Sequence, residues 1–306
     1  MNLEKRSPLN ALGLVLASVE AARNLRAMAL LLGVFATAGL CLAMAESSLA
    51  RSATFWAAIE AGAAVTVAFY GGSAAGLMMM DEARGVAVRS IGDALRASLA
   101  IAHRLLAVLI VMLAGYAIAA AVLLGLLWLC RLPFAGVALF GLVVPLAVVG
   151  TGLAALSMVA VVVPMTAPAV WSGLSAAAVL RQLIQLIRHR LLTVALLMSA
   201  VSLLTAGVGA IVTFVVMAGG RVVSQAAVLV IGINVQPQEL MAGLFGFGLR
   251  SLGAAGAPID ATGFVAAAAV GGGVVFALAL VLPGLVYLRG ACTVYIALCE
   301  SEPAVR

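Results

Sequence analysis

The sequence predicts an all-α membrane protein: a polytopic bundle of six transmembrane helices with three interfacial amphipathic helices on the cytoplasmic side. Of its 306 residues, 65% are hydrophobic and 9% are charged, whereas a soluble domain carries about 25% charged residues. Six nearly uncharged stretches reach the roughly 20 residues that a helix needs to cross a bilayer. We therefore treat residues 1–306 as a single membrane domain.

The first amphipathic helix is expected at residues 8–23, where apolar residues recur every three to four positions. A signal peptide is the alternative, because residues 9–19 have the length of an apolar signal core. Glu20, Arg23 and Arg26 stand where a small-residue cleavage site would lie. The sequence therefore favours an uncleaved interfacial helix.

Spans 1 and 2 are expected at residues 27–45 and at about 54–80. The only charge within them is Glu60, about two turns inside the outer end of span 2. A carboxylate in hydrocarbon costs a few kcal/mol, so we expect Glu60 to reach the interface or pair with an arginine rather than relay protons. The methionines at 78–80 point in three directions on a helix and are expected to face lipid.

The second amphipathic helix follows a polar linker in which the adjacent acids Asp81 and Glu82 are expected to be solvated. Ser90 and Asp93 have the S-x-x-D spacing of a helix start. Apolar residues at helical spacing then continue as far as His103. The pattern is typical of a helix that lies in the membrane interface.

Spans 3 and 4 are expected at residues 105–130 and at about 134–163, joined by a short turn. Pro164 and Pro168 are expected to end span 4, because proline removes a helix hydrogen bond and clashes with the preceding turn. Ser172 would then cap the third amphipathic helix.

That third helix, at residues 172–192, shows the pattern most clearly. Apolar side chains recur at i, i+3, i+4 and i+7 on one face, and Arg181, Arg188 and His189 lie on the other. A run of 30 uncharged residues follows Arg190. The basic residues therefore mark the junction between the amphipathic helix and span 5.

The connection between spans 5 and 6, at about residues 218–260, is the longest expected loop. It is too apolar to be disordered, and its two apolar runs are too short to cross a bilayer. We expect a re-entrant loop that dips into the outer leaflet; the alternative is a cap that only packs on the helices. Span 6 is expected from residue 261 to about 288.

Three similar units organise the chain, at about residues 8–80, 90–164 and 172–288. Each combines an amphipathic helix with a transmembrane hairpin, and basic residues mark the equivalent junctions. These basic residues are the candidates for contact with lipid or a partner: Arg23, Arg26, Arg96, His103, Arg104, Arg181, Arg188, His189 and Arg190.

The basic residues also predict the orientation of the chain. If the N-terminus is inside, only four of the 17 Lys and Arg residues lie in outer segments: Arg51, Arg131, Arg221 and Arg250. Lys and Arg gather on the cytoplasmic side of spans. We therefore expect a bacterial inner-membrane protein with both termini in the cytoplasm. This topology accounts for the net charge of +6, so no nucleic-acid partner is predicted.

Enzyme motifs are missing from the sequence, which contains no H-x-x-x-H, C-x-x-C, G-x-S-x-G or P-loop. The four cysteines lack metal-ligand spacing and are expected to be small core residues. A disulfide between Cys41 and Cys130 is the alternative. We predict no catalytic residues, no metal site and no cofactor.

Two segments carry a resemblance to a known group. Residues 81–95 (DEARGVAVRSIGDAL) and 168–180 (PAVWSGLSAAAVL) resemble the membrane domain attached to some bacterial glycerophosphoryl diester phosphodiesterases, and its YciC-type relatives. The resemblance implies a six-span bundle with amphipathic helices before the odd spans. It also implies a membrane-organising or transport-related role. The phosphodiesterase catalytic domain has no counterpart in this sequence, so no catalytic residues carry over.

A second resemblance is to six-span permeases of ABC-2-type exporters. In that plan residues 8–23, 90–104 and 222–252 would be the N-terminal interfacial helix, the coupling helix and the re-entrant loop. The third amphipathic helix departs from the plan. Two functions therefore remain open: a non-catalytic scaffold or accessory subunit, with lipids, other subunits or a second copy as partners, and a transporter subunit. A buried polar cavity among the spans would favour transport.

Overall fold

The computed structural model describes residues 13, 17–132, 136–231 and 261–300, and within these it contains helices and no strand. Six helices are long and apolar enough to cross a membrane, as in a multi-pass membrane protein. In chain order the elements are η1 (Ala17–Arg23), α2 (Leu25–Ala50), α3 (Thr54–Ala83), α4 (Ile91–Leu129), α5 (Gly136–Ser157), η2 (Met158–Val162), α6 (Val163–Trp171), α7 (Ala176–Ile231), α10 (Ala261–Tyr295) and η3 (Ile296–Glu300). Of the elements labelled η, η1 is a 3₁₀-helix, and η2 and η3 are π-helical segments.

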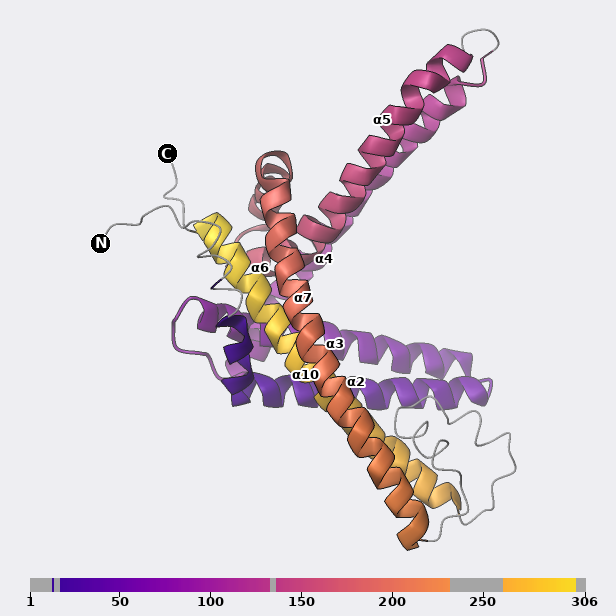
Figure 1. The fold of residues 1–306 in the computed structure, drawn as a ribbon, viewed down its shortest axis with the longest axis vertical. Helices are drawn as coiled ribbons and strands as arrows, with labels where there is room; N and C mark the ends of the chain where they lie inside the picture. The colour runs from indigo at the N-terminus through magenta and orange to yellow at the C-terminus, as the bar shows by residue number, and fades with distance from the viewer. Residues whose placement is uncertain (1–12, 14–16, 133–135, 232–260, 301–306) are drawn as a thin grey trace.

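The six long helices form three hairpins, α2–α3, α4–α5 and α7–α10, which point in different directions from one region (Figure 1). We call this region the hub. It consists of η1, the start of α2, the end of α3, the start of α4, η2, α6, the start of α7 and the end of α10. The helices therefore do not pack side by side along their full lengths as the predicted bundle would.

The apolar core of the protein lies in the hub. Met78, Met79 and Met80 on α3 are each at most 1% exposed, so the prediction that they face lipid is wrong. The end of α3 contacts α2, α4, α6 and α10. Because these helices surround this part of α3, the three consecutive side chains are all buried, although they point in different directions.

Trp171, at the end of α6, links that core to α3. Its indole Nε1 donates a hydrogen bond of 2.9 Å to Ser73 Oγ, and its ring lies against Gly76, where a Cβ atom would overlap it. Gly72, one turn earlier, has open space around its missing Cβ. Only Gly76 of this glycine pair therefore makes room for a neighbour.

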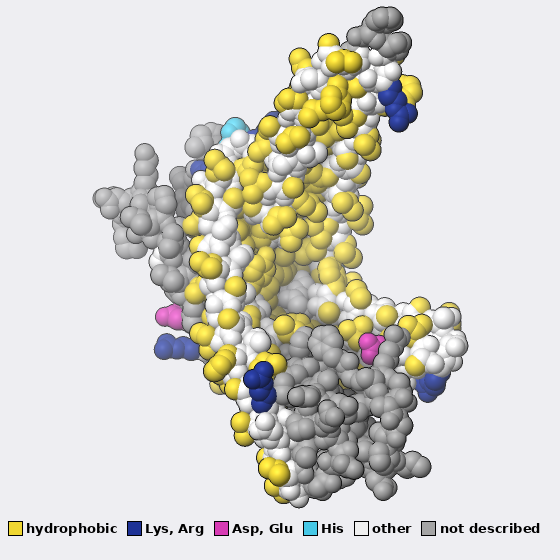
Figure 2. Space-filling view, turned by 45° about the vertical axis from the view of Figure 1, so that its right-hand side comes forward, with side chains coloured by type: hydrophobic (Ala, Val, Ile, Leu, Met, Phe, Trp, Pro, Cys, Tyr) yellow, Lys and Arg dark blue, Asp and Glu magenta, His cyan; other side chains and the backbone are white. Residues whose placement is uncertain are grey.

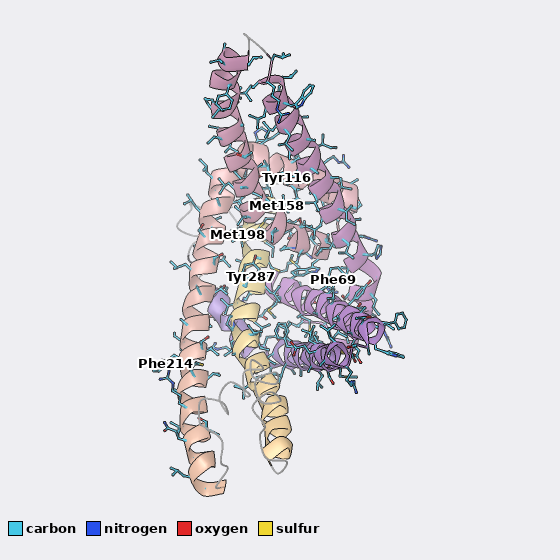
Figure 3. The ribbon with its side chains drawn as sticks, turned by 90° about the vertical axis from the view of Figure 1, so that its right-hand side faces the viewer. Phe69, Tyr116, Met158, Met198, Phe214 and Tyr287 are labelled. Atoms are coloured by element: carbon cyan, nitrogen blue, oxygen red, sulfur yellow. The ribbon has the colours of Figure 1, made fainter. Side chains whose placement is uncertain are left out.

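Beyond the hub the hairpins expose their apolar side chains. Only 6% of an apolar 18-residue stretch of α4 is buried, against 56% in α3. Ile118 and Leu124 on α4 are about two-thirds exposed, and the hairpin α4–α5 presents a continuous apolar surface (Figure 2). On α7, Phe214 points away from α10 (Figure 3).

The second amphipathic segment and span 3 form one helix, α4, rather than two. Its start is as predicted, because Ser90 Oγ accepts a hydrogen bond of 3.2 Å from the Asp93 backbone N–H. No proline follows within the helix to interrupt it. The predicted boundary near residue 104 is therefore wrong.

Span 4 does not end at Pro164, as the sequence predicted, but continues through α6 to Trp171. The π-helical segment η2 precedes Pro164, which lies in the first turn of α6, where proline is tolerated. Ser172 follows the end of α6 and donates to the Ala169 carbonyl instead of capping the next helix. Ser175 accepts a hydrogen bond from the Ala178 N–H as α7 begins.

A break in α7 coincides with the junction predicted at Arg190. Arg190 has non-helical dihedral angles (φ −136°, ψ 18°), which separate residues 176–189 from the long apolar part of the helix. That part continues to Ile231, so the segment from 222 is not a separate re-entrant piece. The remainder of the predicted outer loop, 232–260, lies outside the described residues.

The other spans agree with their predicted positions and are longer. Helices α2 and α3 extend several residues beyond the predicted spans 1 and 2, and α10 continues past residue 288 to Tyr295. The first amphipathic helix is described only as the 3₁₀-helix η1; most of residues 8–16 lie outside the described chain.

Gly76→Ala tests the packing of α3 against Trp171. The added methyl group overlaps the indole ring, and overpacking of this kind costs about 1–3 kcal/mol. We expect a lower thermal unfolding temperature for the purified full chain, whereas the control Gly72→Ala leaves it unchanged or higher. Equal unfolding temperatures for the two variants would contradict the contact.

Candidate functional site

Charged side chains gather at the hub, beginning with Asp81 at the end of α3. Arg89 donates to both Asp81 carboxylate oxygens, from Nε at 2.6 Å and from Nη2 at 2.7 Å. The Asp81 side chain is only 9% exposed. The prediction that Asp81 is solvated is therefore wrong: the ion pair closes the linker between α3 and α4.

Glu82 joins four elements of the hub. It accepts hydrogen bonds from Arg289 Nη1 on α10 at 2.6 Å and from Asn24 Nδ2 at 2.8 Å. Asn24 caps α2, since its Oδ1 accepts from the Ala27 N–H, and Arg289 also lies 3.9 Å from Glu20 on η1. Glu82 thus connects η1, α2 and α10 to α3, contrary to its predicted solvation.

Arg84, just after α3, pairs with Glu300 in η3 through its Nη2 at 2.5 Å and its Nε at 3.3 Å. The hydrogen bond to Glu300 raises the pKa of Arg84, and the hydrogen bond to Asp81 raises that of Arg89. Both cations therefore persist at every physiological pH. We call these paired residues the ionic cluster: Asp81, Glu82, Arg84, Arg89, Arg289 and Glu300.

The nine predicted contact residues lie outside this cluster. Arg104 and Arg190 are half-buried, and the other seven are exposed: Arg23, Arg26, Arg96, His103, Arg181, Arg188 and His189. Within the part of the chain that the structure describes, none of these exposed side chains forms an ion pair. Three arginines are therefore paired within the ionic cluster, whereas five of the predicted contact arginines are exposed.

The start of α4 turns its large apolar side chains outward. Ile91, Leu95 and Leu99 are 36–60% exposed, whereas Ser98 is buried, and its Oγ donates to the Tyr70 carbonyl at 2.7 Å. The predicted apolar face of this segment is therefore accessible beside Arg96. Small residues make the contact with the hub instead.

The amphipathic part of α7 packs on the hub more closely. Leu183 and Leu186 are at most 5% exposed, and Ile184 is 43% exposed. On the same part of the helix, Gln182 Oε1 accepts a hydrogen bond of 3.1 Å from the Tyr295 hydroxyl of α10. The segment thus contacts both the apolar core and the end of α10.

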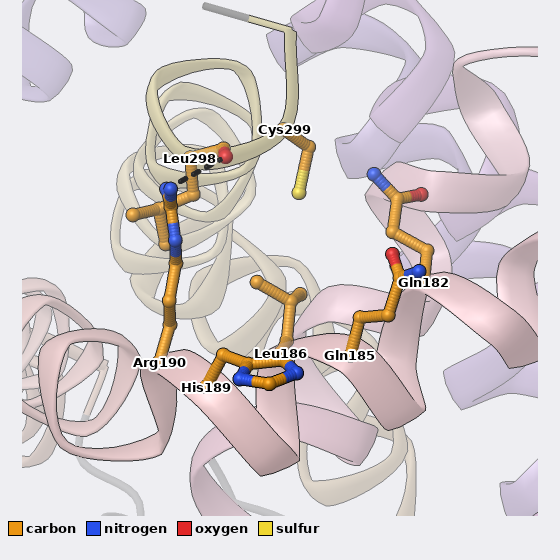
Figure 4. A pocket seen from close by; sticks show the side chains of 7 residues that line it. All are labelled: Gln182, Gln185, Leu186, His189, Arg190, Leu298 and Cys299. Atoms are coloured by element: carbon orange, nitrogen blue, oxygen red, sulfur yellow. Dashed lines mark hydrogen bonds between the residues drawn. The ribbon is translucent and has the colours of Figure 1, made fainter. Parts of the chain in front are cut away.

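A cavity of about 350 Å³ lies between this part of α7 and η3 (Figure 4). Its lining residues are Gln182, Gln185, Leu186, His189, Arg190, Leu298 and Cys299. Arg190 Nη1 donates to the Leu298 carbonyl at 3.3 Å. Of these residues, the sequence predicted only His189 and Arg190 as contact residues.

Glu60 lies on α3, far from the ionic cluster along the helix. Its Oε2 atom is buried and has no hydrogen-bond partner among the described residues. The predicted pairing with an arginine is therefore not seen in that part of the chain.

Metal ligands do not gather at any point of the described chain, in groups of three or more His, Cys, Asp or Glu side chains. Cys41, Cys130, Cys292 and Cys299 are free thiols, so the alternative of a disulfide is not seen. The chain matches no family model, no curated protein and no solved structure.

The sequence missed most of the ionic cluster. No pattern in the sequence singles out Arg89, Arg289 or Glu300, because their partners lie far away in the sequence or across a turn. One signal was present: two adjacent acids, Asp81 and Glu82, stand at the predicted inner end of a span, where basic residues usually dominate.

Asp81→Asn tests the ionic cluster. The substitution removes the carboxylate charge from a nearly buried pair, and hydrogen bonds to charged groups contribute about 1.5–3 kcal/mol. We expect a loss of about 2 kcal/mol in unfolding free energy, measured by denaturant titration of the full chain in micelles.

The matched control is Asp93→Asn, which removes an exposed carboxylate whose hydrogen-bond donor among the described residues is Ser90 Oγ. We expect a much smaller loss there. An equal loss of unfolding free energy in both variants would show that the Asp81–Arg89 pair stabilises the fold no more than an exposed hydrogen bond does.

Proposed function

We propose that this chain is a bacterial inner-membrane protein, with both termini in the cytoplasm, that serves as a non-catalytic scaffold or accessory subunit of a membrane complex. One observation carries the proposal: the hub has a packed apolar core and several ion pairs, while the hairpins leave their apolar flanks uncovered. Apolar flanks of this extent require lipid or other membrane helices as neighbours.

The geometry of the hairpins supports the same proposal. Transmembrane helices tilt by about 0–40° from the bilayer normal, whereas these hairpins point in three different directions (Figure 1). To cross one bilayer, the hairpins must turn about the hub. The linker at 84–90, the π-helical segment η2 and the break at Arg190 are the joints at which they can do so. The flanks are then free to pack on neighbouring subunits.

The exposed basic residues support a cytoplasmic hub. Arg96 lies beside the exposed Leu95 and Leu99 on α4, a combination suited to the inner leaflet. Each Lys or Arg near an anionic membrane surface contributes about 1 kcal/mol of attraction. The same cations could receive an acidic partner, and either use agrees with the cytoplasmic placement that we propose for the hub.

A transporter subunit is the second candidate, motivated by the resemblance to ABC-2-type permeases. The cavity beside Arg190 lies between the amphipathic part of α7 and η3, and not along the long apolar parts of the helices. Buried hydroxyl groups such as Ser157 and Thr166 donate to carbonyls of their own helices. These observations favour the scaffold. The resemblance to the YciC-type group agrees with the number of long helices and with either role.

Orientation is tested with single cysteines in a variant whose four native cysteines are replaced by serine. A membrane-impermeant maleimide added to the periplasmic side should label cysteines at positions Arg51 and Arg131. It should leave cysteines at Arg96 and Arg181 unlabelled until the membrane is opened. Labelling of Arg181 in intact cells would overturn the cytoplasmic placement of the hub.

The scaffold role is tested by photo-crosslinking in native membranes. A photoreactive amino acid at the exposed positions Ile118 and Phe214 should form adducts with another protein chain or a second copy. The buried position Val108, on the same helix as Ile118, is the control and should react only within the chain. If the exposed positions capture lipid alone, the flanks serve no partner and the scaffold proposal fails.

A further inference from the structure

The cavity between α7 and η3 is lined mainly by polar side chains, with two leucines beside them. We infer that it binds a phosphate group, and specifically the headgroup of an anionic phospholipid of the inner leaflet. The choice of a lipid rests on the proposed cytoplasmic placement of the hub. The phosphate chemistry itself rests on the lining residues alone.

Hydrogen-bond donors line one wall of the cavity. Gln182, Gln185 and His189 follow one another at i, i+3 and i+7, which places them on one face of α7. The Tyr295 hydroxyl donates to Gln182 Oε1 at 3.1 Å, and the Gln182 amide nitrogen is directed toward the cavity (Figure 4). Glutamine amides and a histidine ring can each donate to a phosphate oxygen, which only accepts.

The charge of the cavity also fits an anion. Among the residues that the structure describes, its lining includes Arg190 and His189 and no acidic side chain. Glu300, next to the lining residue Cys299, is paired with Arg84 and does not line the cavity. Arg190 is anchored at the cavity by its hydrogen bond to the Leu298 carbonyl, so its guanidinium group is already oriented. A cation ligand would require carboxylates, which this wall does not provide.

The position and size of the cavity favour a lipid over a soluble anion. It lies at the Arg190 break, where the amphipathic segment becomes the long apolar helix, and this junction is expected at headgroup depth. Leu186 and Leu298 add apolar surface for the glycerol end of a lipid. A volume of about 350 Å³ is within the range of small-ligand pockets.

The test is native mass spectrometry of the full chain purified in detergent, with delipidated protein titrated with short-chain phosphatidylglycerol in high salt. The pocket variant is Gln185→Leu/His189→Leu, whose two side chains are exposed and are not part of the core. The matched control is Arg181→Gln, an exposed cation on the same helix that does not line the cavity. Unfolding temperatures of all three proteins are compared first.

We expect wild type and Arg181→Gln to bind one phosphatidylglycerol with similar affinity. The pocket variant should bind about tenfold or more weakly, because it loses two donors to a charged group. Equal weakening in Arg181→Gln would mean general surface attraction and would overturn the inference. So would the absence of any bound phosphate species in wild type.

A titration with inorganic phosphate distinguishes the two possible ligands, a lipid headgroup and a free phosphate ion. If it displaces the lipid at high concentration, the phosphate site is supported with the lipid as its occupant. If it binds while the lipid does not, the phosphate site is supported and the lipid is overturned. Photo-crosslinking from Ile118 does not depend on this cavity. A failure to detect lipid binding would therefore overturn this inference without affecting the test of the scaffold proposal.

Discussion

The structure depends on polar contacts at one end of apolar helices. Inside a bilayer, lipid tails are as apolar as leucine, so burying leucine between helices provides no hydrophobic driving force. Specific contacts must then decide which helices meet. Here Glu82 with Arg289, and Arg84 with Glu300, join the first hairpin to the end of α10. Asp81 with Arg89 fixes the entry into α4, and the close contact of Trp171 with Gly76 completes the hub.

This arrangement explains how one chain combines a rigid region with separate hairpins. The hub is held by ion pairs, by small residues that allow close approach and by fully buried methionines. The hairpins beyond it expose much of their apolar surface, and two of them are interrupted near the hub, one by the π-helical segment η2 and one by the break at Arg190. A protein built in this way offers long apolar flanks to a membrane while the hub keeps a fixed shape, as the proposed scaffold role requires.

Much of the fold could be predicted from the sequence because hydropathy and charge act locally. The six spans follow from uncharged runs, the start of α4 from Ser90 and Asp93, and the break in α7 from the basic residues around Arg190. The sequence could not show which face of a span is buried, because apolar residues suit both lipid and core. Met78–Met80 were misplaced for this reason.

The candidate site was predictable only in part, for a different reason. The exposed arginines are recognisable because each stands next to an apolar run. The ionic cluster is not, because Arg289 lies 207 positions from Glu82 and only the fold brings them together. The prediction at Pro164 is wrong because proline ends a helix only where its missing N–H is needed for a hydrogen bond. Here the π-helical segment η2 precedes Pro164 and shifts the hydrogen-bond pattern, so the helix continues.

The central claim is that the hub is rigid and the hairpins are joined to it separately. Double electron–electron resonance on the full chain in lipid nanodiscs tests it, with one spin-label pair in the hub, at the exposed Arg23 and Arg181, and one at the tips of two hairpins, at Ser52 and Arg131. The account predicts a narrow distance distribution for the hub pair and a clearly broader one for the tip pair. Equally narrow distributions for both pairs would contradict it, because they would describe a single rigid bundle.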